Sequence, residues 1–320
     1  MKKQIYILDN CKSFEPVHIF ECGQCFRWNK EVDGSYTGVF GNNVLNVKKE
    51  DNKIIFEGIC DGDIEEVCRD YFDLDTDYEE IKKKLSSIDD YLKTSIEYGN
   101  GIRILNQDLW ETIISFIISA NNNIPRIKGI IDRISKKYGN KITYKGKDYY
   151  TFPDMNALGR ASVEDLRALG LGFRDKRIYE TTKMFLNKEI TLEELENEKD
   201  TVALREKLMT LSGVGGKVAD CIMLFSLKKY DVFPIDVWVR RVMNELYIKE
   251  EDENKVSKTL IQNLAKEKYE ELAGLAQQYL FYWKRDAWNL RNNCVLALLL
   301  YERKSSTYKK YVSGISFLSA

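Results

Sequence analysis

The segment DLWETIISFIISA, residues 108–120, constrains the fold more than any other stretch of the chain. It is apolar on almost every side of a helix, and such a helix is stable only when other elements cover it all round. Asp108 stands directly before the apolar run, where a capping residue is expected. At 320 residues the chain is long enough to build a full core around this helix. The sequence therefore predicts a buried central helix.

The N-terminal part has a different pattern, typical of short strands. The runs SYTGVF (35–40), NVLNVKK (43–49) and KIIFEGI (53–59) are rich in β-branched and aromatic residues. Turn-forming pairs and triplets separate them, namely DG, GNN and EDN. This pattern predicts an antiparallel meander with one covered face.

From about residue 85 onward the pattern becomes helical. Residues 162–185 predict helix, glycine turn and helix, and residues 204–227 predict a second pair joined by SGVGG. We expect an α+β protein with a small domain containing an antiparallel β-sheet at 1–98 and a mostly α-helical domain at 99–320. The segment after Asp286 contains no motif that we can assign.

Charge and cysteine content exclude several classes of protein. The net charge of −1 gives no overall attraction for DNA, although residues 126–147 are strongly basic. Seven cysteines without a secretory pattern do not indicate a disulfide framework. Cys22 and Cys25 lack a second pair at zinc spacing, Cys221 and Cys294 cannot complete an iron–sulfur cluster, and His18 is the single histidine. We expect no metal and no cofactor.

No apolar run approaches the length of a membrane span. The apolar run near the start of the chain, IYIL, is too short for the apolar region of a secretory signal. We expect a monomer with no membrane partner. The composition favours a cytoplasmic protein, associated with the nucleoid if the source is bacterial.

The turn SGVGG runs straight into Lys217, at the start of the second helix of its pair. Glycines at this turn leave backbone N–H groups free, and the positive end of the helix dipole attracts phosphate. The same dipole disfavours an ammonium, and partial burial would lower the pKa of Lys217 further. A neutral amine is a nucleophile, so the sequence predicts an activated lysine. An exposed lysine on a packed αα-hairpin is the alternative.

Two further residues stand near Lys217 in this pattern. Asp236 follows Pro234 and precedes a helical run, so we expect a helix cap that is also a positioned carboxylate. Cys221 lies four residues after Lys217, on the same helix face, where a buried apolar role is the default.

These residues match a known family. LSGVGGKVADCIML (211–224) and VFPIDVW (232–238) resemble the helix-hairpin-helix superfamily of DNA glycosylases. GQCFRW (23–28), GIRILNQD (101–108), NNNIPRI (121–127) and AGLAQQYLF (273–281) are similar to its 8-oxoguanine DNA glycosylase branch. The resemblance covers most of the chain and implies a bifunctional glycosylase and abasic-site lyase of base excision repair.

The resemblance implies a role for each matching residue. Lys217 would attack C1′ of the damaged nucleoside and form a Schiff base, with Asp236 assisting its deprotonation. Phe281 would stack on the flipped base, with Cys221 near its other face. Gln277 would bind the Watson–Crick edge, and the carbonyl of Gly23 would accept the N7–H that guanine lacks.

The same resemblance implies how the protein would bind duplex DNA with 8-oxoguanine opposite cytosine. The phosphate backbone of the DNA would be contacted by Gly213, Gly215 and Gly216. Asn121 would fill the hole in the duplex, and Arg126 would face the orphaned cytosine. Phe173 would wedge beside it, with Arg174 adding a contact. Trp238 stands where relatives often carry a histidine beside a DNA phosphate, so the resemblance does not carry that phosphate contact over to this chain.

Two other functions fit the pattern less well. A superfamily member that acts on alkylated bases would usually lack the hairpin lysine. One that acts on oxidised pyrimidines would usually carry an iron–sulfur cluster, which the cysteines of this chain cannot build. A non-catalytic DNA-binding module would use the hairpin for phosphate contact alone and would not need the pairing of Lys217 with Asp236.

Overall fold

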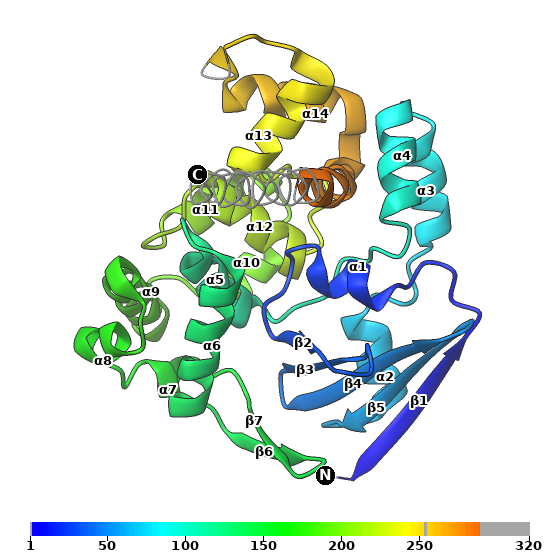
Figure 1. Ribbon diagram of the computed structural model, residues 1–320. Coiled ribbons are helices and arrows are strands. Elements are labelled where there is room, and N and C mark those ends of the chain that lie inside the picture. The colour runs from blue at the N-terminus through cyan, green and yellow to red at the C-terminus, as the bar shows by residue number, and fades with distance from the viewer. Residues whose placement is uncertain (1, 253–254, 289–320) are drawn as a thin grey trace, which may run out of the picture.

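The structure is a computed structural model that describes residues 2–252 and 255–288. A sheet and its covering helices form one side of the molecule, and a larger assembly of helices forms the other (Figure 1). The predicted α+β fold class is confirmed.

The N-terminal sheet has five antiparallel strands in the order β1-β5-β4-β3-β2. The strands are β1 (Lys3–Asp9), β2 (Trp28–Lys30), β3 (Tyr36–Phe40), β4 (Asn43–Glu50) and β5 (Lys53–Ile59). The three runs predicted as strands are β3, β4 and β5. β1 and β2 are the two edges of the sheet, which the sequence reading did not assign.

Close contact with an aromatic ring fixes the register between β2 and β3. Trp28 pairs with Gly38, and a Cβ on Gly38 would lie 2.2 Å from the indole ring. The indole stacks on Phe20 at 4.1 Å and donates from Nε1 to the Tyr71 hydroxyl at 3.0 Å. Only glycine leaves room for Trp28 at this position.

Helices make up most of the remaining chain. They are α1 (Pro16–Glu21), α2 (Ile64–Tyr71), α3 (Tyr78–Ser86), α4 (Asp90–Tyr98), α5 (Leu109–Ser119), α6 (Ile124–Tyr138), α7 (Met155–Leu158), α8 (Val163–Ala168), α9 (Asp175–Leu186), α10 (Leu192–Asn197), α11 (Thr201–Met209), α12 (Gly216–Ser226), α13 (Val237–Met243) and α14 (Lys258–Tyr269), followed by a helix over 273–288. Helices therefore begin well before residue 85, where the sequence placed the change of pattern.

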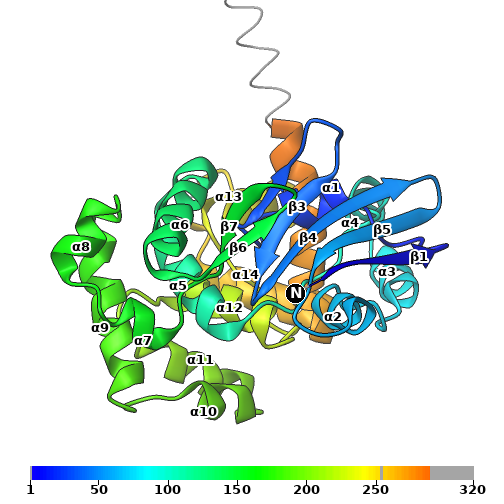
Figure 2. The same cartoon turned by 90° about the horizontal axis from the view of Figure 1, so that it is seen from below.

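The apolar segment forms the expected central helix. Asp108 caps α5 by accepting from the N–H of Glu111 at 2.7 Å, and nine of the helix's eleven residues are buried. Viewed from below, α5 and α12 lie between the sheet on one side and α7 to α11 on the other (Figure 2).

The buried cores divide earlier than residue 98. Phe14, Phe56 and Phe72 belong to the core under the sheet, whereas Leu85 and Leu92 pack into the core of the helices. The side chains of α3 and α4 thus contact the helical part, although the sequence grouped them with the sheet. The domain limits 1–98 and 99–320 stay a prediction, and the second one ends outside the described residues.

A small hairpin was also missed. β6 (Lys141–Tyr144) pairs with β7 (Lys147–Tyr150) inside the basic stretch of the sequence. Its Tyr144 hydroxyl donates to Glu57 of β5 at 2.7 Å, which ties this hairpin to the N-terminal sheet.

No helix in the described ranges is both long enough and apolar enough to cross a membrane.

Gln24 joins the sheet side to the extended segment that leads into α5. Its Nε2 donates to the carbonyls of Ile19 and Arg103 at 2.9 and 2.7 Å, and its Oε1 accepts from the N–H of Leu105 at 2.9 Å. The side chain is fully buried. The Ile19 carbonyl also accepts from the Cys22 thiol at 3.3 Å, so the Arg103 carbonyl and the Leu105 N–H are the groups that depend on this amide.

We expect Gln24→Leu to lower the free energy of unfolding by about 2–4 kcal/mol, because it leaves buried backbone groups without partners. Urea unfolding followed by circular dichroism measures the change. The control Gln262→Leu on α14 should shift stability by less than about 0.5 kcal/mol. Equal effects of the two substitutions would contradict this role for Gln24.

Candidate active site

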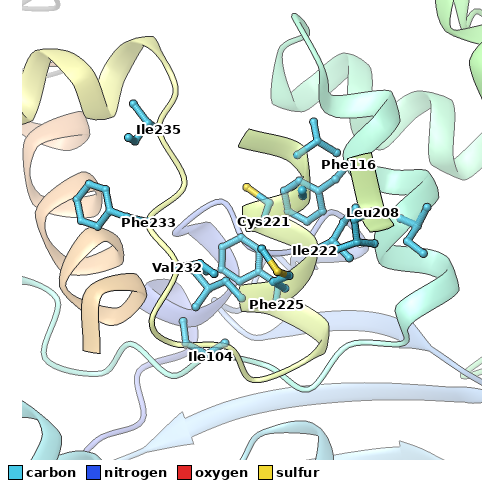
Figure 3. Close-up of a cluster of buried hydrophobic side chains, with 14 of the residues drawn as sticks. Ile104, Phe116, Leu208, Cys221, Ile222, Phe225, Val232, Phe233 and Ile235 are labelled. Carbon is cyan, nitrogen blue, oxygen red and sulfur yellow. The ribbon is translucent and has the colours of Figure 1, made fainter. Parts of the chain in front are cut away.

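The site is built where α12 packs against α5. Phe225 of α12 stacks on Phe116 of α5, with ring centroids 5.5 Å apart. Figure 3 shows Cys221, Ile222 and Phe225 of α12 among the apolar side chains of this region. This packing fixes the first turn of α12, and with it Lys217, relative to the rest of the core.

One cavity of about 500 Å³ opens at this place. Its lining includes every residue that the sequence assigned to catalysis or to base binding: Gly23, Lys217, Cys221, Asp236, Gln277 and Phe281. These residues come from a turn after α1, from α12, from the start of α13 and from the helix over 273–288. The fold therefore brings together groups that are more than 250 positions apart in the sequence.

Lys217 lies in the first turn of α12, as predicted, and its side chain is half-buried. The Nζ atom lies 5.3 Å from the centroid of the Phe116 ring, a distance typical of a cation–π contact. Lys217 also lines the cavity and interacts with the Cys221 sulfur. The alternative of an exposed hairpin lysine does not fit this placement.

The sequence predicts a lowered pKa for Lys217, and this prediction is wrong. Burial alone would lower it, but the Cys221 sulfur and the carboxylates of Asp236 and Asp220 outweigh burial and raise the pKa. Burial raises the pKa of Cys221 to about 11, so at neutral pH its thiol is uncharged. The lysine is thus an ammonium in the free protein and must lose a proton before it can act as a nucleophile.

Asp236 is the N-cap of α13, as the sequence indicated. Its Oδ1 accepts from the N–H of Val239 at 2.8 Å. The cap fixes the carboxylate at the cavity wall and uses only Oδ1 of its two oxygens. One residue therefore both starts a helix and places a negative charge near the amine.

The opposite side of the cavity is shaped by a glycine turn. Gly23 has a φ of +89°, and a Cβ there would lie 3.6 Å from Cε1 of Phe281. Arg285 donates to the carbonyl of Glu21, and its guanidinium lies 5.6 Å from the Phe281 ring centroid. Arg285 thus holds the turn before Gly23 against the helix that carries Phe281.

The hairpin glycines differ in what surrounds them. Gly213 has a φ of +87°, a backbone conformation that glycine adopts readily and other residues rarely do. A Cβ on Gly216 would lie 2.2 Å from the Arg205 guanidinium, which makes an ion pair with Asp220 at 2.7 Å. Gly215, the N-cap of α12, has no atom within 4 Å of its Cβ position. The backbone at Gly215 is open to a ligand.

Three of the predicted DNA-binding residues are exposed. Asn121 has a φ of +51°, just after α5. Arg126 reaches the carbonyl of Gly170 at 3.4 Å, and Phe173 is 54% exposed. None of the three lines the cavity, so they form a separate surface beside it.

Arg174 differs from the prediction that it would add a direct contact to DNA. It is 1% exposed, and its guanidinium donates to the carbonyls of Ala120, Asn121 and Leu171. A contact with a base would require these bonds to break. In this structure Arg174 instead joins the loop of Phe173 to the loop of Asn121.

The basic stretch is less available than its composition indicates. Lys128 donates to the carbonyl of Trp28, Arg133 to that of Leu169 at 2.7 Å, and Lys137 pairs with Asp165 at 2.7 Å. These cations hold the protein together, so the stretch as a whole is not a free surface for phosphate.

Sequence reading missed Phe116 and Gln278 as residues of the site. Both line the cavity. Phe116 was counted among the core residues of its apolar helix, and the neighbour of Gln277 carried no signal of its own. Trp238 also lines the cavity, and its indole packs on Trp288 with centroids 5.3 Å apart.

The comparisons with known proteins agree with this geometry. The family described as "8-oxoguanine DNA glycosylase, N-terminal domain" matches residues 7–113. The family described as "HhH-GPD superfamily base excision DNA repair protein" matches residues 114–280. Fold and site together define a helix-hairpin-helix protein of base excision DNA repair. The chain belongs to the HhH-GPD superfamily and, within it, to the 8-oxoguanine DNA glycosylases, which confirms the resemblance seen in the sequence.

Three relatives illustrate the similarity. The probable N-glycosylase/DNA lyase of Methanothermobacter thermautotrophicus is 34% identical over 66% of this chain and 71% of its own. The N-glycosylase/DNA lyase of Saccharomyces cerevisiae is 33% identical over 72% of this chain and 67% of its own. The Clostridium acetobutylicum 8-oxoguanine glycosylase/lyase, in complex with DNA that has cytosine opposite 8-oxoguanine, is 42% identical, with a TM-score of 0.84 over 90% of this chain and 98% of that one.

We expect Asp236→Asn to lower the pKa of Lys217, because a neighbouring negative charge stabilises the ammonium and its removal does not. Asparagine caps a helix as well as aspartate, so α13 should be kept. Reductive methylation of Lys217 by formaldehyde, followed by peptide mass spectrometry, should then reach half of its maximal rate at a lower pH than in the wild type.

Asp200→Asn is the matched control, because Asp200 caps α11 in the same way at an exposed position. It should leave the pH profile of Lys217 unchanged. A profile that Asp236→Asn does not move would show that this carboxylate does not retain the proton on the amine.

Proposed function

We propose that Lys217 is the nucleophile with which this protein excises 8-oxoguanine from duplex DNA and then cleaves the strand at the abasic site. The observation that carries the proposal is a half-buried amine near a fixed carboxylate, in a cavity of about 500 Å³. That volume lies in the range of small-ligand sites and suits a single flipped nucleotide base. Exclusion of water strengthens the electrostatic contacts of both groups.

The base must leave the duplex before it can react, because C1′ is inaccessible in the stacked helix. Asp236 accepts a proton from the Lys217 ammonium, and Nζ then attacks C1′. The glycosidic bond breaks, its electron pair leaves with the base, and the base takes up a proton. The C1′–O4′ bond of the sugar ring then opens, O4′ takes up a proton that the nitrogen loses, and the C1′–Nζ bond becomes the double bond of a Schiff base. The Schiff base activates a C2′ hydrogen, and removal of this hydrogen expels the 3′ phosphate by β-elimination.

Recognition follows from the other lining residues. Phe281 and Cys221 lie at the cavity wall, where they would face the two sides of a base, and Gln277 would bind its Watson–Crick edge. The Gly23 carbonyl would accept the N7–H that 8-oxoguanine has and guanine lacks. A site with a buried acceptor rejects a base that leaves it unpaired.

Binding of the duplex would use the surface beside the cavity. The open backbone at Gly215, which lies between Gly213 and Gly216 in the hairpin turn, suits a phosphate at the start of α12. Asn121 would enter the hole left by the flipped base, with Arg126 facing the orphaned cytosine and Phe173 wedged beside it. The Clostridium acetobutylicum protein, similar to this chain, was solved with cytosine opposite 8-oxoguanine.

Borohydride trapping tests the nucleophile. The full chain is incubated with duplexes that carry 8-oxoguanine, uracil, thymine glycol or an alkylated adenine, and borohydride is added. We expect a covalent adduct on the 8-oxoguanine duplex and its complete loss in Lys217→Gln. Lys207→Gln, on α11 of the same hairpin, is the matched control and should retain the adduct.

The other outcomes identify the alternatives. An adduct on a different lesion would move the substrate to an alkylated base or an oxidised pyrimidine. Intact binding with neither base release nor adduct would indicate a DNA-binding module without catalysis. An adduct that persists in Lys217→Gln would remove this lysine from the reaction.

Gly215→Ser tests the hairpin. Serine is a favourable N-cap, and the Cβ position is open, so the free energy of unfolding should stay the same or rise slightly. If a phosphate approaches this backbone, the side chain will obstruct it, and we expect the Kd for duplex DNA to rise about tenfold, the effect of losing about one charge-assisted hydrogen bond. Fluorescence anisotropy measures the Kd, and an unchanged value would place the phosphate elsewhere.

A further inference from the structure

Two adjacent glutamines on the helix over 273–288 form a hydrogen-bonded pair at the cavity wall. Gln277 and Gln278 are each 4% exposed, and both line the cavity. Nε2 of Gln278 donates to Oε1 of Gln277 at 2.8 Å. This bond joins a residue with a proposed role in base recognition to one that has none so far.

The remaining polar atoms of the pair show which orientation is preferred. Oε1 of Gln278 is inaccessible to solvent and has no hydrogen-bond partner among the described residues. If both amides were turned over, a buried NH2 group with two donors would occupy that unpaired position. One unpaired acceptor is the less costly arrangement, because each buried and unpaired polar group is unfavourable.

This orientation determines what Gln277 presents to a ligand. Its Oε1 has two lone pairs, one of which accepts from Gln278 and the other of which is free. In the described part of the chain no partner accepts from its Nε2, which leaves this donor to the cavity. Gln277 thus offers an acceptor and a donor in a fixed order.

The order distinguishes two kinds of base edge. A guanine edge has N1–H as a donor and O6 as an acceptor, whereas an adenine edge has N1 as an acceptor and its N6 amino group as a donor. A freely rotating carboxamide pairs with either edge by turning over. A carboxamide held in one orientation pairs with only one of them.

We propose that Gln278 is a positioning residue that locks the Gln277 carboxamide in the orientation that accepts a guanine edge and rejects an adenine edge. The proposal rests on the proposed function, because it takes Gln277 as the group that meets the flipped base. Turning Gln277 over would set its NH2 group against that of Gln278, so two donors would face each other. Gln278 therefore contributes to lesion choice without touching the base.

The substrates for the test are duplexes with 8-oxoguanine or 8-oxoadenine, each opposite cytosine. Both bases have the 8-oxo group and the N7–H, so the proposed contact to Gly23 is the same in both. They differ at the Watson–Crick edge. The ratio of their single-turnover excision rates therefore reports on that edge, and a general loss of activity cancels.

Gln278→Met keeps the length of the side chain and removes the donor. We expect the rate ratio to fall at least about tenfold towards 8-oxoadenine, the effect of about one net hydrogen bond. Gln278→Glu is the second variant, because an ionised carboxylate can only accept and would turn Gln277 over. In this variant the ratio should fall as the pH rises and the carboxyl ionises.

Gln262→Met and Gln262→Glu on α14 are matched controls outside the cavity. They should keep the wild-type ratio at every pH. A ratio within twofold of the wild type in both Gln278 variants, or an equal loss on both bases, would overturn the role of Gln278. A wild-type protein that releases no 8-oxoguanine would instead contradict the proposed function itself.

Discussion

The contact between α5 and α12 is the interaction on which the site depends. It places the Lys217 amine against the Phe116 ring in the wall of the cavity. A buried cation is stable only with nearby negative or polar groups, and Asp236 and the Cys221 sulfur provide them here. The central helix that organises the core therefore also forms the wall against which the proposed nucleophile packs.

The surroundings of Lys217 reverse the pKa shift that its place in the sequence predicts. A helix dipole and burial both favour the neutral amine, yet the Cys221 sulfur and the carboxylates of Asp236 and Asp220 outweigh them and raise the pKa of Lys217. The lysine is thus stored in its protonated form and becomes reactive only when that proton moves. In the proposed mechanism, protonation of the amine in the free protein and its deprotonation with a bound substrate are separate steps.

Local sequence patterns were sufficient where the structure follows from local forces. The β-branched runs became β3, β4 and β5, the apolar segment became α5, and Asp108 and Asp236 became caps. Tertiary contacts decided the rest. Arg174 looks like a surface cation in the sequence but is buried under three carbonyls, and Leu85 packs with distant helices. The cavity residues assigned to catalysis and base binding were predictable from the family motifs, whereas Phe116 and Gln278 were missed. The pKa of Lys217 and the bond between Gln277 and Gln278 were not predictable, because both require the positions of atoms.

Apart from Cys221, which shares α12 with Lys217, the groups proposed for choosing the base lie on other elements than those proposed for chemistry. Lys217 and Asp236 belong to α12 and to the start of α13, whereas Gln277, Gln278 and Phe281 share the helix over 273–288. A change in that last helix can alter which lesion is admitted without disturbing the amine or its carboxylate. Such a division lets the base-recognition residues of a glycosylase change during evolution while its catalytic residues stay the same.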